Sequence, residues 1–175
     1  GLAKAAIAIT VNGDKKDLCD PIEADTKDSI ITIYSSEGLE IMRHTLTAQV
    51  LARAVKNLYP DTKLAIGPTI SDGFYYDFEF TKPISPDDLQ NIEKEMRKII
   101  DTKSSITKTL HSKEDALKVF KEKGEVYKES IIKESNQDND FQLYYQDDDE
   151  FVDLCRGPHL PSLKHIGSFK LTKLA

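Results

Sequence analysis

The stretch that decides the fold is Phe151-Val152-Asp153-Leu154-Cys155-Arg156-Gly157-Pro158-His159. Val152 and Leu154 alternate with Asp153 and Cys155, so in a strand the carboxylate and the thiol share one face. Gly157-Pro158 ends regular pairing and turns the backbone, which brings the His159 imidazole back toward that face. The stretch therefore predicts a strand that presents an Asp, a Cys and a His together. The alternative is that Cys155 is a small buried hydrophobe and His159 an ordinary loop residue.

The segments around this stretch predict an antiparallel sheet with packed helices. Residues 141–145 form an alternating strand, and an acidic turn at 147–150 makes them the hairpin partner of 151–155. Residues 105–110 predict a further strand, and 74–80 a strand with Tyr76 on its apolar face. Apolar stripes with helix-start and helix-stop residues predict helices from about 85 to 100, from 112 to 124 and around 126–132.

A long helix is predicted from about Leu39 to Leu58, where apolar residues recur every four positions and Tyr59-Pro60 stops the pattern. His44 lies in its first turns among polar residues. A lone helical histidine is more often solvated than catalytic, so His44 gains a role only from the rest of the site.

Residues 1–36 are rich in strand signals, with a tight turn at Asn12-Gly13-Asp14 and a strand at 30–34. The polar break at 35–38 is the expected domain boundary. The fold class is therefore α+β, with a small N-terminal segment (1–36) and a main domain (37–175).

Composition limits the function classes. The 175-residue chain carries a net charge of −6, which excludes a generic polyanion binder, and the lysines and arginines between 94 and 108 favour a solvated face over an RNA contact. Cys19 and Cys155 suggest no disulfide framework, so we expect a cytoplasmic protein. The sequence holds no apolar run of transmembrane length, and we expect no membrane partner.

The sequence resembles the N-terminal region of bacterial threonyl-tRNA synthetase over almost its whole length. The resemblance is carried by six stretches: residues 1–5 (GLAKA), 37–44 (EGLEIMRH), 65–68 (AIGP), 73–77 (GFYYD), 124–128 (GEVYK) and 152–159 (VDLCRGPH). The last motif also occurs in the related alanyl-tRNA editing domains.

This resemblance implies a fold and an activity. Residues 1–36 look like the C-terminal part of a TGS domain, a ubiquitin-like β-grasp, and residues 37–175 look like an editing domain that hydrolyses seryl-tRNA(Thr). The partner would be the tRNA(Thr) 3′ end carrying serine. No cofactor is expected here, since the ATP, magnesium and catalytic-domain zinc of the full-length family enzyme, and its homodimer contacts, belong to other domains. No ligase activity is expected from residues 1–175 alone.

The resemblance also assigns roles to site residues. His44 and Lys128 would hold the ribose hydroxyl, the water or the developing oxyanion, and Asp153 would orient the substrate amine. Cys155 and His159 would line the pocket and position water. Tyr76, Gln49 and Arg156 would contact the substrate.

One departure from the family pattern concerns the long helix. The family has His-x-x-x-His, but Ala48 stands four residues after His44, and counting back from 65–68 places the second family histidine at Gln49. One extra residue therefore lies between His44 and Gln49, and it would rotate these side chains apart in a regular helix. Either the helix begins after His44, or a π-bulge near 45–47 absorbs the residue; the apolar period favours the bulge.

The missing histidine affects the expected metal binding and the expected editing activity. Only His44, Cys155 and His159 remain as candidate zinc ligands, and we expect no bound metal. Two alternatives to editing stay open: a zinc-dependent deacylase of the alanyl type, and a non-catalytic tRNA-binding appendage.

Overall fold

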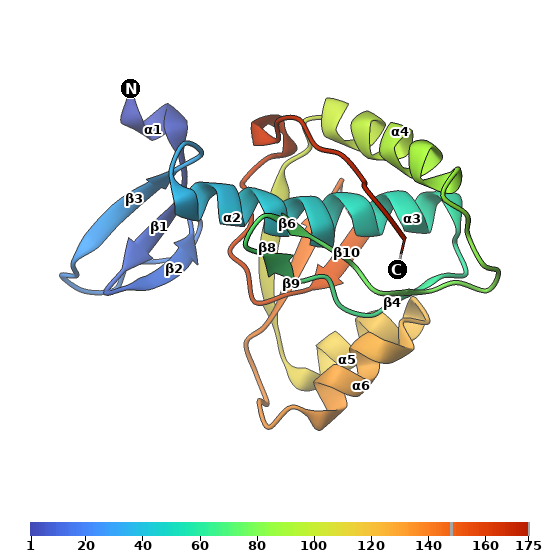
Figure 1. Cartoon of the computed structure of the whole chain (residues 1–175). Helices are drawn as coiled ribbons and strands as arrows, with labels where there is room; N and C mark the ends of the chain where they lie inside the picture. The colour runs from blue at the N-terminus through green and yellow to red at the C-terminus, as the bar shows by residue number, and fades with distance from the viewer. Residues whose placement is uncertain (148, 175) are drawn as a thin grey trace.

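A long central helix organises the computed structural model, which describes residues 1–147 and 149–174 (Figure 1). The helix begins as α2 (Ser36–Thr45), continues as a π-helix (Leu46–Leu51) and ends as α3 (Ala52–Leu58). The backbone N–H of Ala52 donates to the carbonyl of Thr47, five residues back, as a π-helix requires. The predicted bulge is thus confirmed, and it extends further along the helix than expected.

A three-stranded antiparallel sheet lies beside this helix. Its strands are β8 (Ile106–His111), β9 (Phe141–Gln146) and β10 (Phe151–Leu154), in the order β10-β9-β8. The predicted hairpin is confirmed, with Asp153 opposite Tyr144. Cys155 follows the last strand residue, so β10 ends one residue earlier than predicted.

The two faces of this sheet have different chemistry. One face is apolar and packs against the helical pair α5 (Lys113–Glu122) and α6 (Val126–Glu134), through Ala116, Phe120, Ile132, Phe141, Leu143 and Val152. The other face carries Tyr144, Gln146 and Asp153. Gln146 bonds to the long helix, Tyr144 to the N-terminal sheet and Asp153 to Lys128 of α6. This polar face of the sheet therefore contributes buried polar residues next to the long helix.

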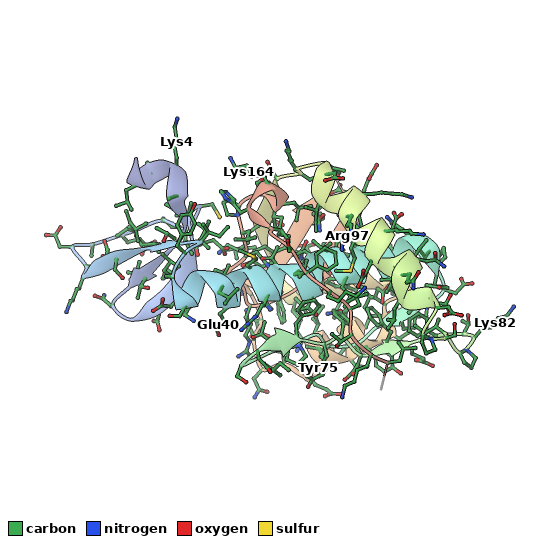
Figure 2. All side chains as sticks on the ribbon, turned by 45° about the horizontal axis from the view of Figure 1, so that its top comes forward. Lys4, Glu40, Tyr75, Lys82, Arg97 and Lys164 are labelled. Atoms are coloured by element: carbon green, nitrogen blue, oxygen red, sulfur yellow. The ribbon has the colours of Figure 1, made fainter. Side chains whose placement is uncertain are left out.

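Helix α4 (Asp88–Asp101) covers another side of the long helix. Their shared core consists of Leu46, Val50, Leu51, Ala54, Val55, Ile92, Met96, Ile99 and Leu163, the last from the short 3-10 helix η2 (Leu163–His165). Arg97 of α4 lies over Phe169, 4.9 Å from the ring centre, and so joins α4 to the C-terminal segment (Figure 2).

The N-terminal residues form a second sheet. Helix α1 (Leu2–Ala5) leads into β1 (Ala6–Val11), which pairs with β2 (Asp14–Asp17) and β3 (Asp28–Thr32) in the order β2-β1-β3. The turn at Asn12-Gly13 is where the sequence predicted it, with both residues at positive φ. This sheet packs on the main body through a core of Ile7, Ala8, Ile31, Ile41 and Leu160.

The segment between α3 and α4 corrects one expectation. The single strand predicted at 74–80 is wrong, because its two ends pair with different partners. Strand β6 (Gly73–Phe74) pairs with β5 (Thr69–Ile70), and β7 (Phe78–Glu79) pairs with β4 (Lys63–Leu64). The alternation itself holds, since Phe74, Tyr76, Phe78 and Phe80 are half-buried and pack against the core of the long helix. In the described residues, no helix combines the length and apolar character needed to cross a membrane.

Candidate active site

His44 and Cys155 meet where the long helix passes the end of β10. The Nε2 atom of His44 lies 2.7 Å from the Sγ atom of Cys155. Burial lowers the pKa of His44 and raises the pKa of Cys155 to about 12. At neutral pH the pair is therefore a thiol in hydrogen-bond contact with a neutral imidazole.

His159 forms the third member of this group. Its ring stacks on that of His44, with centroids 4.6 Å apart and planes 3° from parallel, and the edge of Tyr144 meets it at 4.5 Å. Its Nδ1 atom lies 3.0 Å from the hydroxyl of Thr45. Burial, with a further contribution from His44, lowers the pKa of His159 well below its ordinary value. The ring is therefore neutral over the physiological range.

Gly157 lets the turn pass close to this group. Its φ of +63° lies in the left-handed region, and a Cβ atom there would come within 1.9 Å of the Tyr144 hydroxyl oxygen. Its backbone N–H donates to Sγ of Cys155 at 3.3 Å. A glycine is thus required for both the conformation and the space.

Lys128 and Asp153 make a buried ion pair beside the thiol. Their Nζ and Oδ1 atoms are 2.8 Å apart, and the side chains are only 5% and 2% exposed. Burial raises the pKa of Asp153, while Lys128 and the N–H of Leu154 oppose the rise. The sequence predicted Lys128 at a polar helix start and His159 in a Gly-Pro turn, both as site residues outside the core. Both are instead buried, because α6 passes the edge strand β10 and the Gly157 turn folds inward.

The three residues predicted to contact substrate lie in different surroundings. Tyr76 stacks on Phe78 and has a buried hydroxyl without a partner among the described residues. Burial first, and then Asp153, raises its pKa, so its hydroxyl lies within electrostatic range of the ion pair. Arg156 is exposed. Gln49 is fully buried and accepts hydrogen bonds from Gln146 with its side-chain oxygen, at 2.8 Å, and with its backbone carbonyl, at 3.0 Å.

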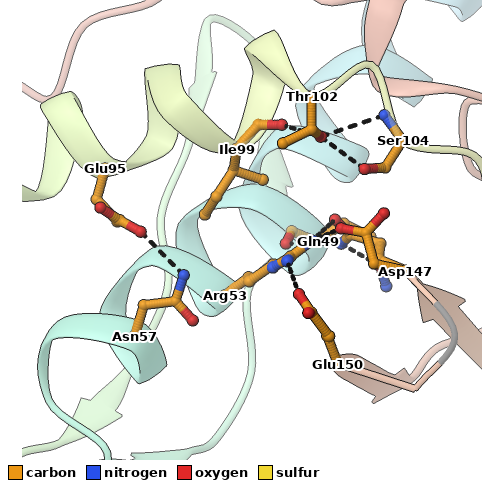
Figure 3. Close-up of polar contacts among 10 residues, drawn as sticks. Gln49, Arg53, Asn57, Glu95, Ile99, Thr102, Ser104, Asp147 and Glu150 are labelled. Carbon is orange, nitrogen blue, oxygen red and sulfur yellow. Dashed lines mark hydrogen bonds and ion pairs between the residues drawn. The ribbon is translucent and has the colours of Figure 1, made fainter.

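Gln49 therefore belongs to a polar network between the long helix and the turn that follows β9 (Figure 3). Arg53, one turn further along the helix, donates to Gln146, Asp147 and Glu150, at 3.2, 2.6 and 2.7 Å. The network ties the long helix to the turn between β9 and β10. Because of the π-helix, two side chains of the long helix face the sheet together. His44 contacts Cys155, and Gln49 contacts Gln146 on the polar face of the sheet.

Three residues that surround His159 were not predicted as site residues. Thr45 contacts its ring, Tyr144 packs against it, and Asp17 of β2 accepts its backbone N–H at 2.9 Å. Asp17 also accepts from the Tyr144 hydroxyl at 2.7 Å and pairs with Lys108 at 2.9 Å. Tyr144 could have been found, because it stands opposite Asp153 in the hairpin. Asp17 follows a charged turn and gives no local signal of burial.

The site has the side-chain types that zinc prefers. One ligand atom each from His44, Cys155 and His159 lie within 4.8 Å of one another. Three protein ligands and a water are the usual set of a catalytic zinc site. The thiol would first have to lose its proton, and burial disfavours that loss.

The C-terminal part of the chain matches a known domain family. Residues 142–174 match the threonyl and alanyl tRNA synthetase second additional domain. This segment contains β10 and His159, and most of β9.

Three curated relatives match the whole chain. It is 47% identical over 175 residues to the threonine--tRNA ligase of Nitrosococcus oceani, 49% over 177 residues to that of Paramagnetospirillum magneticum, and 45% over 175 residues to that of Hahella chejuensis. In each case the match covers all of this chain and 27% of the relative. The chain thus spans about a quarter of the length of these ligases.

Proposed function

Since the chain is homologous along its whole length to the N-terminal region of bacterial threonine--tRNA ligases, we propose that it removes serine from mischarged tRNA(Thr) by ester hydrolysis. The observation that carries this proposal is the buried Lys128–Asp153 pair next to the neutral thiol and imidazoles. Residues 37–175 are proposed as the editing domain, and residues 1–36 as the end of a TGS-like β-grasp. The reaction would take place in the cytoplasm.

The proposed reaction needs no covalent intermediate. The aminoacyl ester is already activated, so a positioned water suffices: its oxygen bonds to the carbonyl carbon, the ester bond breaks, and the ribose oxygen takes a proton. Asp153 would bind the substrate's ammonium group, and Lys128 would hold the ribose hydroxyl or the oxyanion. The Cys155 thiol is a poor nucleophile with a pKa of about 12, and this favours direct attack by water.

The substrate would enter from the side of His44 and Cys155. These two side chains are half-buried, whereas those of Lys128, Asp153 and His159 are buried. Exposed Arg156 stands beside Cys155 in sequence and would meet the phosphates of the tRNA 3′ end.

Such a second site is needed because serine and threonine differ by one methyl group. A difference of that size gives about 1–3 kcal/mol of discrimination in a binding pocket. A hydrolytic pocket that excludes the extra methyl adds a second selection. We expect the packed side chains of Asp153, Tyr76 and Tyr144 to exclude the methyl group.

The test compares two substrates and a double variant. The wild-type chain should deacylate Ser-tRNA(Thr) and spare Thr-tRNA(Thr). Lys128→Ala alone should destabilise the fold by about 3–5 kcal/mol, because it leaves a buried carboxylate unpaired. Lys128→Met with Asp153→Leu replaces both charges by apolar groups and should keep the fold while abolishing deacylation.

A matched control uses the pair Glu129–Lys133 on the same helix, in which Lys133 is exposed and Glu129 is half-buried. Glu129→Gln with Lys133→Met should leave both fold and deacylation unchanged. The proposal would be refuted by equal rates on the two substrates, by no rate above buffer, or by full activity of the Lys128/Asp153 double variant.

Zinc-dependent deacylation is the second candidate, favoured by the approach of His44, Cys155 and His159. Zinc bound by these three residues would supply a water of lowered pKa. We expect no stoichiometric zinc in protein purified without chelator, because the second histidine of the family pattern is replaced by Gln49, whose side-chain oxygen is bonded to Gln146. Elemental analysis decides between the two candidates, and one zinc per chain would make the second one preferred.

A further inference from the structure

The hydroxyl of Thr45 has two hydrogen-bond partners, and both belong to the segment that comes after β10 in the chain. Thr45 is the last residue of α2 and is fully buried. Its Oγ1 atom accepts the backbone N–H of Leu160 at 3.0 Å and lies 3.0 Å from Nδ1 of His159. This one oxygen therefore anchors both the backbone and the ring of the histidine turn.

The hydrogen-bonding capacity of a hydroxyl decides which partner donates. A threonine hydroxyl has one proton and two lone pairs, and the N–H of Leu160 already uses one lone pair. If Nδ1 of His159 carried a proton, both contacts would use lone pairs. The hydroxyl proton would then be buried without an acceptor among its described contacts, at a cost of about 1–3 kcal/mol. If Nδ1 is the acceptor, every group at this oxygen is satisfied.

The other ring nitrogen then carries the proton. Nε2 of His159 is buried and has no hydrogen-bond partner within residues 1–147 and 149–174. The ring cannot turn freely, because His44 stacks on one face and the Tyr144 ring meets it edge-on. His159 thus presents one unused N–H group in a fixed direction.

We propose that Thr45 is a positioning residue that holds His159 in the Nε2–H tautomer, so that His159 acts as a hydrogen-bond donor to an oxygen of the bound ester or of the attacking water. In this form Nε2 has no free lone pair, so it serves neither as a general base nor as a metal ligand. The donor role rests on the proposed deacylase function. The assignment of the tautomer does not rest on that function, because the contacts of Thr45 determine the tautomer whether or not the chain is active.

The tautomer can be measured directly. In protein labelled with ¹⁵N-histidine, long-range ¹H–¹⁵N correlation spectra distinguish a protonated ring nitrogen from an unprotonated one. The chain has four histidines, and the variant His159→Gln identifies the signals of His159. We expect an unprotonated Nδ1 and a protonated Nε2 in the wild type near pH 7.

Two substitutions test the role of the hydroxyl. Thr45→Ser keeps the hydroxyl and should keep the tautomer and kcat for Ser-tRNA(Thr). Thr45→Val removes it and should give a mixture of tautomers, with kcat lower by about tenfold and KM little changed. Thr47→Val is the matched control, since Thr47 is a buried threonine of the same helix whose hydroxyl bonds to the carbonyl of Tyr75. It should leave the His159 tautomer unchanged.

The outcomes separate this inference from the proposed function. A protonated Nδ1 in the wild type overturns the inference, and this measurement needs neither a variant nor activity. A folded Thr45→Val protein with the wild-type tautomer and kcat overturns it as well. If the wild type shows the Nε2–H tautomer but no deacylation, the assignment of the tautomer stands, and the donor role fails together with the proposed function.

Discussion

At the scale of a single residue, the protonation of the Cys155 thiol distinguishes direct attack by water from a covalent thioester mechanism. Its raised pKa and its contact with neutral His44 predict that it stays protonated during the reaction. Cys155→Ser preserves a small donor and should lower the deacylation rate by less than about tenfold. Single-turnover kinetics with Ser-tRNA(Thr) measures the effect. A seryl-thioester trapped in the wild type by acid quench and detected by mass spectrometry would contradict the expectation.

The buried histidines predict how stability depends on pH. The folded-state pKa of His159 lies well below the ordinary value of 6.5, and the pKa of His44 is also lowered. Below about pH 6.5 the unfolded chain therefore binds more protons than the folded one, and stability falls as the pH falls. Above that pH the contribution is constant.

Thermal melts between pH 7.5 and 5.5 should show this decline in Tm. The variant His159→Gln should show a smaller decline over the same range, because it loses the contribution of His159 and retains those of His44 and His165, whose pKa values burial also lowers. His111→Gln is the control, since His111 lies at the end of β8, outside the site. Equal slopes for wild type and His159→Gln would contradict the assignment of the decline to His159.

The π-helix leads to a prediction at the scale of one element. It holds one residue more than an α-helix needs, so deletion of Ala48 should close the segment into a regular α-helix. The rest of the long helix should keep its contacts. Deletion of Ala54 in α3, where regular α-helix leaves no spare residue, should instead rotate one end of the helix relative to the other. Both alanines are buried in the same helix, which makes the second deletion a matched control.

Circular dichroism melts compare the two deletions. We expect a cooperative transition for the Ala48 deletion and its loss, or a much lower Tm, for the Ala54 deletion. The idea that the π-helix absorbs a spare residue would be wrong if the Ala48 deletion were as damaging as the other.

The same elements show how far sequence reasoning reaches. The hairpin of β9 and β10, the strand β8 and the helices α4, α5 and α6 follow from local period and from turn residues, and all are present. The strand predicted at 74–80 failed because its ends pair with different strands, which no local pattern records. His44, Cys155 and His159 were predicted to converge, and they do. Lys128 was predicted as a site residue at a polar helix start, but its burial could not be predicted, because it depends on pairing with Asp153 across the fold.

At the scale of the whole molecule, Asp17 joins the N-terminal sheet to the site. This carboxylate is buried, pairs with Lys108, and accepts from Tyr144 and from the backbone of His159. Asp17→Ala should therefore destabilise the whole chain by about 3–5 kcal/mol, the cost of breaking a buried ion pair from one side. Asp14→Ala, at the exposed end of the same strand, is the control and should change stability by less than about 0.5 kcal/mol.

Urea unfolding followed by two probes tests this link. Far-UV circular dichroism reports on all elements, and the near-UV signal of Tyr144 and its aromatic neighbours reports on the site. We expect coincident transitions in the wild type, and a shift of both in Asp17→Ala. If only the far-UV signal shifted, the N-terminal sheet would be an independent unit.

The contacts of the site also determine when it can form during folding. His44 and Cys155 are separated by 111 positions in the chain, Thr45 and His159 by 114, and Asp17 and His159 by 142. Contacts of such sequence separation carry a large loop-closure entropy and are made late. On a ribosome they must wait until the segment after β10 has left the exit tunnel. Deacylation would then report the completion of folding, and a chain arrested before His159 would contain most of the elements without any assembled site.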